Sequence, residues 1–210
     1  MRRILPAVFL LVATTLTHTR ASNAPRPGVD WPQFRGISAG GIAEGFSIPA
    51  TWNAANNTNV AWKTPIPGLG LSSPVVWGDT VFVSTSISGK TDANLKVGLY
   101  GDISPVQDDT VHEWRVYALD KKSGKIKWQQ TTYTGVPKIK RHMKNSHANS
   151  TLATDGERVI AFFGSEGLYA YDMKGNSSGR RISAYLTPAS TGCPRRNGRR
   201  AARRCCMTAW

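Results

Sequence analysis

A four-residue pattern recurs 52 residues apart, and this repeat limits the folds open to the chain more than any other feature. Residues 117–120 read Tyr-Ala-Leu-Asp, and residues 169–172 read Tyr-Ala-Tyr-Asp. The stretches before them also correspond, because residues 73–82 and 150–160 each contain an apolar run, a turn and a second apolar run. Repeats of this length are typical of solenoids and propellers, whose units stack to bury a shared core.

Alternation of apolar and polar residues with a period of two indicates strands along most of the chain. Turns rich in Gly, Asn and Asp separate these segments, and four antiparallel strands per repeat make up a propeller blade. We therefore predict an all-β fold, a partial β-propeller of about two four-stranded antiparallel blades with a disordered basic C-terminal tail. The predicted strands are residues 59–63, 73–77, 80–84, 113–119, 125–130, 149–153, 158–163 and 168–172.

The predicted organisation follows from these strands and from shifts in composition. In the second repeat, the turn at residues 173–176 is followed by no strand that carries Trp, so this blade should lack its outer strand. The predicted parts are a signal peptide at 1–24, an N-terminal extended segment with a blade-closing strand at 25–70, a first blade at 71–135 with a long insertion at 86–110, an incomplete second blade at 136–176, and an aberrant, disordered Arg-rich tail at 177–210.

The first residues have the layout of a secretory signal peptide, with Arg2 and Arg3 before an apolar run from residue 4 to about residue 16. A membrane anchor is the alternative, but the run is shorter than the ~20 residues that cross a bilayer. We therefore predict a periplasmic or secreted protein without a transmembrane span after removal of the signal.

The formal charge of +14 belongs mainly to the two ends. The first 24 residues contribute +3 and residues 177–210 contribute +8, which leaves +3 for residues 25–176. An ordinary charge on the folded part argues against a nucleic-acid partner, although a tail that binds nucleic acid or an anionic surface remains a less favoured alternative. The tail also holds all three cysteines, including the vicinal pair Cys205 and Cys206, and lacks strand periodicity. A reading-frame change near Asn176 is our hypothesis for its origin.

The repeat motif has a physical logic. The carboxylate of Asp120 can accept backbone N–H bonds in the turn, Gly124 supplies a positive φ, and Trp128 lays a large ring against the next blade. This pattern resembles the PQQ-type repeat of quinoprotein-like propellers. Residues 31–36, 61–63, 72–79 and 146–151 resemble the start of exported bacterial members, so the resemblance covers about residues 31–176. The residues assigned to the blade motif are Tyr117, Asp120, Gly124, Trp128, Tyr169 and Asp172.

The resemblance implies a scaffold more than a chemistry. Some members are dehydrogenases that hold pyrroloquinoline quinone and a divalent metal in the propeller axis. Others are not enzymes, such as the propeller lipoprotein of the outer-membrane barrel-assembly machine. We therefore predict a fragment of an exported, non-catalytic propeller scaffold that binds a protein or small ligand and needs no cofactor. The alternative is a fragment of a quinoprotein dehydrogenase, which would need the quinone with its metal.

The loop between the two blades holds the candidate ligand-binding residues Lys140, Arg141, His142, His147 and Asn149. It could form an anion site with His142 and His147 as ligands or bases. A solvated connection, in which Ser146, Asn149 and Ser150 satisfy turn backbone, is the favoured interpretation. The acidic group of Asp108, Asp109 and Glu113 has no partner at metal-ligand spacing, so we expect solvated charge there.

Overall fold

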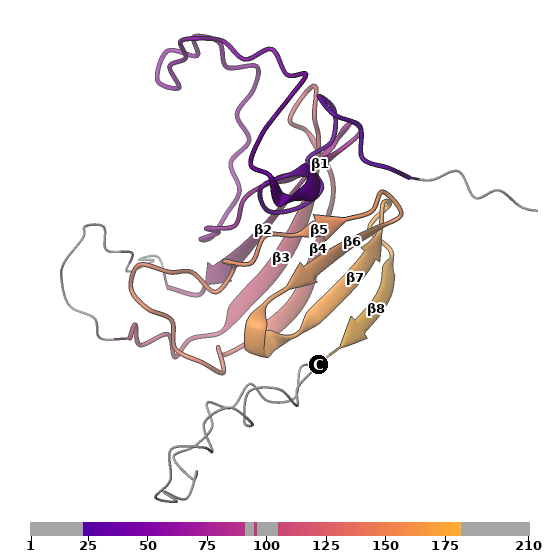
Figure 1. The fold of residues 1–210 in the computed structure, drawn as a ribbon. Coiled ribbons are helices and arrows are strands. Elements are labelled where there is room, and N and C mark those ends of the chain that lie inside the picture. The colour runs from indigo at the N-terminus through magenta and orange to yellow at the C-terminus, as the bar shows by residue number, and fades with distance from the viewer. Residues whose placement is uncertain (1–22, 91–94, 96–104, 182–210) are drawn as a thin grey trace, which may run out of the picture.

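The computed structural model describes residues 23–90, 95 and 105–181, and it consists of two antiparallel sheets packed side by side (Figure 1). Each sheet has four strands in sequential order, which confirms the all-β fold and the two blades. Within the described residues, helical structure is confined to two short 3₁₀ turns, η1 (Ile37–Ala39) and η2 (Gly164–Glu166). The predicted signal peptide up to residue 22 and the tail from residue 182 lie outside the described residues.

The two blades share their strand order and one irregularity of register, although the turn after the motif is one residue shorter in the second blade. In the first blade β3 pairs with β4 and the pairing shifts between Ala118 and Leu119. In the second blade β7 pairs with β8 and shifts between Ala170 and Tyr171, at the same place in the repeated motif. The blades are therefore copies of one unit. Their strands are β1 (Val75–Trp77), β2 (Thr80–Ser88), β3 (His112–Asp120) and β4 (Ile126–Gly135), followed by β5 (Ala153–Thr154), β6 (Arg158–Phe162), β7 (Leu168–Asp172) and β8 (Ser177–Arg181).

The repeated turns are built as the sequence predicted. Asp120 Oδ1 accepts hydrogen bonds from the backbone N and the hydroxyl of Ser123, at 2.8 and 2.7 Å, and Gly124 has φ +71°. In the second blade Asp172 Oδ1 accepts bonds from the backbone N of Lys174 and Asn176, at 2.9 and 2.8 Å. These hydrogen bonds lower the pKa of both carboxyl groups, in each blade chiefly through the bond from the side chain of Ser123 or Asn176.

The second blade has an outer strand, so the prediction that it lacks one is wrong for residues 177–181. The turn after Asp172 returns the chain, and β8 pairs with β7 through backbone groups, which needs no apolar side chain. Ser177 to Arg180 are exposed, which explains why no alternation marks them. The residue opposite Ala170 is Gly179, whereas Trp128 stands opposite Ala118 in the first blade.

The N-terminal segment forms no strand at residues 59–63, contrary to the prediction. It is attached to the first blade by isolated backbone bridges, of Trp31 with Val76 and of Leu69 with Ser86, and by side chains. Trp62 Nε1 donates to the carbonyl oxygen of Lys121 at 2.9 Å, and its ring lies against Gly124. Trp128 repeats this contact on the second blade, where Nε1 donates to the carbonyl oxygen of Met173 at 3.0 Å and the ring lies against Gly175.

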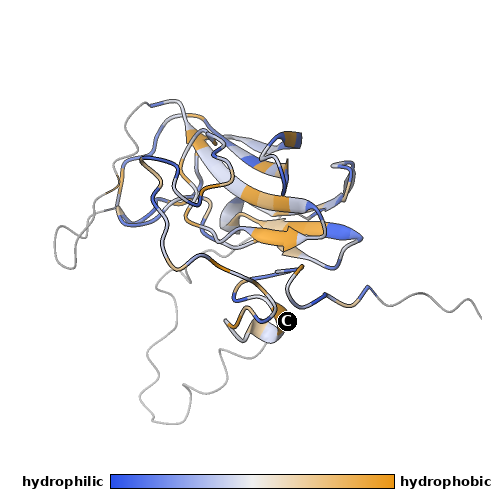
Figure 2. Cartoon of the chain, turned by 90° about the horizontal axis from the view of Figure 1, so that it is seen from above, coloured by the Kyte–Doolittle hydropathy of each residue, from blue (hydrophilic) through white to orange (hydrophobic). Residues whose placement is uncertain are grey.

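The hydrophobic core lies between the two sheets. In the view of Figure 2, hydrophobic colour is concentrated on the strands, and hydrophilic colour on the turns that join them. Aromatic rings from both blades pack together. The half-buried Trp128 lies against Phe82 and Tyr171, with ring centroids 5.9 and 6.1 Å apart. Buried members of the core are Val75, Phe82, Trp114, Val116, Ala118, Ala148, Leu152, Val159, Ala161, Phe163, Tyr169 and Tyr171.

The insertion begins later than predicted, because β2 continues to Ser88, and it ends where β3 begins at His112. Ser86 pairs with Trp114 and Ser88 with His112, so the two strands extend each other beyond their apolar centres. This extension carries the ends of β2 and β3 to the loop between the blades, where the candidate site lies.

Candidate functional site

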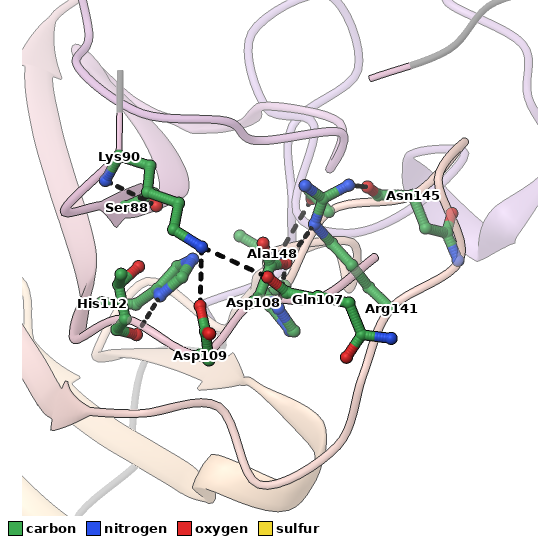
Figure 3. Close-up of polar contacts among 12 residues, drawn as sticks. Ser88, Lys90, Gln107, Asp108, Asp109, His112, Arg141, Asn145 and Ala148 are labelled. Carbon is green, nitrogen blue, oxygen red and sulfur yellow. Dashed lines mark hydrogen bonds and ion pairs between the residues drawn. The ribbon is translucent and has the colours of Figure 1, made fainter. Parts of the chain in front are cut away.

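A cavity of about 200 Å³ opens where the ends of β2 and β3 meet the insertion and the loop that joins the two blades (Figure 3). All three segments contribute polar side chains to its wall, and Figure 3 draws several of them pointing toward one another. The cavity is lined by Gly68, Leu69, Ser86, Ile87, Ser88, Lys90, Asp108, His112, Arg141 and His147.

Asp108 joins the insertion to the loop between the blades. Its Oδ2 accepts hydrogen bonds from Arg141 Nε at 2.7 Å and from His147 Nε2 at 3.0 Å. The side chains of Asp108, Arg141 and His147 are 6%, 7% and 8% exposed, so the ion pair is almost completely desolvated. Removing one partner of such a buried ion pair strongly destabilises the fold, because the other charge is left buried and uncompensated. The loop backbone supports the pair, since Val106 N donates to the carbonyl oxygen of Arg141 at 3.0 Å.

Burial favours the neutral form of the His147 ring. Burial lowers its pKa below the usual value, and the hydrogen bond and charge of Asp108 only partly oppose this effect. Its backbone is fixed as well, because Trp114 Nε1 donates to the carbonyl oxygen of His147 at 3.1 Å. The neighbouring residues form a tight turn in which Asn149 Oδ1 accepts bonds from the backbone N and hydroxyl of Ser146.

His112 is the first residue of β3, and its ring lies against that of His147. Its Nδ1 is 2.8 Å from the carbonyl oxygen of Thr110, and since a carbonyl only accepts, Nδ1 carries the proton. The lone pair of His112 therefore resides on Nε2. The two imidazole rings meet edge to face with centroids 5.3 Å apart.

The structure brings two of the five predicted loop residues, Arg141 and His147, into this cavity. Lys140 and Asn149 line a second hollow of about 210 Å³ on the other side of the same loop, which Arg141 and His147 also border. His142 is exposed, and its Nδ1 accepts a hydrogen bond from the backbone N of Lys144. Asn149 Oδ1 accepts the expected turn bond from the backbone N of Ser146, but the loop is not simply solvated, because Arg141 is buried in it.

The three acidic residues considered together in the sequence lie apart in the structure. Asp109 is exposed and pairs with Lys90 Nζ at 2.6 Å, while Glu113 pairs with Arg115. These two carboxylates agree with the expectation of solvated or surface charge, whereas Asp108 contradicts it. Its partners come from a loop 33 and 39 residues further along the chain, and sequence spacing does not reveal such a contact.

His112 was missed altogether by the sequence reasoning, although a signal for it was present. Trp114, Val116 and Ala118 alternate on one face of the predicted strand, and two residues back along that face stands His112. Extending a period of two beyond the apolar run would have predicted its burial.

Pyrroloquinoline quinone, which the resemblance implies for catalytic members, does not fit this cavity. The cavity has a volume of about 200 Å³, which is below the ~300–1,000 Å³ of ordinary small-molecule sites. Asp108 in its wall would also oppose the carboxylates of the quinone, and this residue already neutralises Arg141.

Comparison with known proteins gives one finding. A PQQ-type repeat family model described as "Outer membrane protein assembly factor BamB" matches residues 49–190. None of the curated proteins matches the chain. Among the described residues, no helix is long and apolar enough to span a bilayer.

Proposed function

This chain belongs to the PQQ-type repeat family described as outer membrane protein assembly factor BamB, and we propose that it acts as an exported, non-catalytic scaffold that binds a protein or small ligand. The description of the family names a role in assembly, which supports a protein as the partner. The signal-like N-terminus supports a periplasmic or secreted location.

The observation that carries this proposal is the surface on which the insertion and the loop between the blades meet. Two segments far apart in sequence are fixed there by the buried pair of Asp108 and Arg141. The same loop carries exposed apolar side chains, with Val136 and Ile139 each 47% exposed, and Ile139 lines the second hollow together with Arg141 and His147. A preformed surface of mixed polarity suits recognition, because binding it requires little further ordering.

The proposal predicts that partner contact is confined to one end of the blades. Ile139 lies in the loop between the blades, and Ile126 begins β4 at the opposite end of the strands, with matched exposures of 47% and 45%. We would place a photo-crosslinking amino acid at each position in the full chain, exported in a host with an outer membrane. A discrete adduct is expected from Ile139 and none from Ile126. Equal labelling from both positions would contradict the proposal.

The quinoprotein alternative is tested separately. The full chain is titrated with pyrroloquinoline quinone and Ca²⁺, and dye reduction is followed with alcohols as substrates. The scaffold proposal predicts neither stoichiometric uptake of the quinone nor reduction of the dye. Uptake together with dye reduction would overturn the non-catalytic role.

A further inference from the structure

Three side chains that commonly bind metal converge on one wall of the cavity. Asp108 ends the insertion, His112 begins β3, and His147 belongs to the loop between the blades. One possible ligand atom from each residue lies within 4.8 Å of the others. Ligand atoms around a tetrahedral Zn²⁺ are about 3.4 Å apart, given bonds of about 2.0–2.2 Å, so small side-chain rotations would close the set.

One of the two histidines, His112, is oriented as metal ligands usually are. A metal-bound imidazole normally donates its other ring N–H to a carbonyl or carboxylate, which fixes the tautomer. His112 already has this arrangement, since Nδ1 donates to the carbonyl oxygen of Thr110 and Nε2 keeps the lone pair. The hydrogen bond from Trp114 Nε1 to the carbonyl oxygen of His147 fixes the backbone of the second histidine, whose ring meets that of His112 edge to face.

A buried hydroxyl in the same wall lacks a partner. Ser86 is 4% exposed, it lines the cavity, and its Oγ makes no hydrogen bond to any described residue. Buried polar groups are nearly always satisfied by protein or by ordered water. A metal ion held by three protein ligands keeps an open position for water. Such a water would supply the bond that Ser86 lacks.

Arg141 orients the carboxylate of Asp108 and also limits the affinity of the site for a cation. Its Nε donates to Asp108 Oδ2, the oxygen that His147 also contacts. A metal ion would replace the bond between His147 and Asp108, while Arg141 would continue to orient the carboxylate from outside. Because the guanidinium is a nearby positive charge, the ion should bind more weakly than in a structural zinc site.

We propose that Asp108, His112 and His147 bind one divalent transition-metal ion, with Zn²⁺ as the best match. Two imidazoles and one carboxylate suit zinc, whereas Ca²⁺ and Mg²⁺ require mostly oxygen ligands. The bound ion ties the insertion and the end of β3 to the loop between the blades. This site differs from the axial metal of quinoprotein dehydrogenases and does not depend on the proposed scaffold function.

The test is titration of the full chain with Co²⁺, followed by its visible absorption bands, and with Zn²⁺ by calorimetry. Since thiolates also bind these ions, Cys193, Cys205 and Cys206 are replaced by Ser throughout. We expect one ion per chain, with no equivalent binding of Ca²⁺. His147→Gln should weaken binding by more than the ~10–100-fold typical of losing an outer-shell partner. His142→Gln, an exposed histidine of the same loop, is the matched control and should bind as the parent does.

His112→Gln and Asp108→Asn extend the test to the other two ligands, and circular dichroism shows whether each variant folds. If either fails to fold, His147→Gln decides, and its loss of Zn²⁺-dependent thermal stabilisation is the second readout. Absence of binding at a large molar excess of Co²⁺ would overturn the proposal. Binding that survives His147→Gln, or that Ca²⁺ matches, would overturn it as well.

Discussion

The two blades have the same strand order and share a bulge after the motif alanine, yet the face that carries this alanine is covered differently in each. In the first blade Ala118 is fully buried, because the second blade packs over it. Its counterpart in the second blade, Ala170, is only half-buried. On the opposite face the motif tyrosines Tyr117 and Tyr169 are both buried, and Tyr169 belongs to the core that the two blades share. The backbone therefore builds a blade, and a neighbouring unit determines how much of it is buried.

The contact between the blades shows the same difference. Trp128 on β4 packs against Gly175 in the turn of the second blade, and Trp62 packs against Gly124 in the same way. At the corresponding position of β8 stands Gly179, and no described atom lies within 4 Å of a side chain built there. A strand can pair without the tryptophan, but it then lacks the side chain that attaches one unit to the next.

The largest effect on stability is expected from substitution of Gly175, the glycine against which Trp128 packs. A Cβ on Gly175 would lie 2.8 Å from Trp128 Cδ2, and φ there is +87°. Gly175→Val should lower the free energy of unfolding by about 3–4 kcal/mol, from backbone strain and overpacking together. Gly179→Val is the matched control in the same blade and should stay within about 0.5 kcal/mol of the parent. Urea denaturation measures the free energy of unfolding of both variants. Equal losses from Gly175→Val and Gly179→Val would contradict the difference between the two positions.

Removal of the ring itself should cost somewhat less. Trp128→Ala deletes a half-buried indole and the hydrogen bond from its Nε1 to the carbonyl oxygen of Met173. We expect a loss of about 2–3 kcal/mol, below the ~3–5 kcal/mol of a fully buried tryptophan. Ser178→Ala, on the exposed outer strand of the second blade, should change stability little. A larger loss from Ser178→Ala would mean that β8 carries a side-chain contact beyond those described.

The smallest effect concerns the turns, and here the two blades should behave alike. The pKa of Asp120 and of Asp172 is lowered in the folded state, so each ionised carboxylate stabilises the fold above the unfolded pKa of about 3.8. This contribution is lost as the pH falls from about 3.8 through the lower folded pKa. Asp120→Asn and Asp172→Asn should each flatten the acid limb of the unfolding midpoint against pH, by similar amounts. An effect from only one variant would show that the two turns are not equivalent.

The sequence predicted the blades well where side chains alternate, and less well where backbone alone decides. The motif around Asp120 and Gly124 predicted the turn because its requirement is local. β8 was missed because its pairing with β7 depends on backbone hydrogen bonds and leaves Ser177 to Arg180 exposed. Asp108 was misplaced for the opposite reason, since its partners are brought to it only by packing of the two blades.

Amide hydrogen exchange of the full chain tests the central comparison most directly. Both outer strands pair with their neighbours, but only β4 is also held by a tryptophan that packs on the next unit. Local opening follows buried contact more than hydrogen-bond number. We predict slow exchange along β4 between Ile126 and Gly135, and markedly faster exchange along β8 between Ser177 and Arg181. Equal protection of the two strands, or slower exchange in β8, would contradict this account.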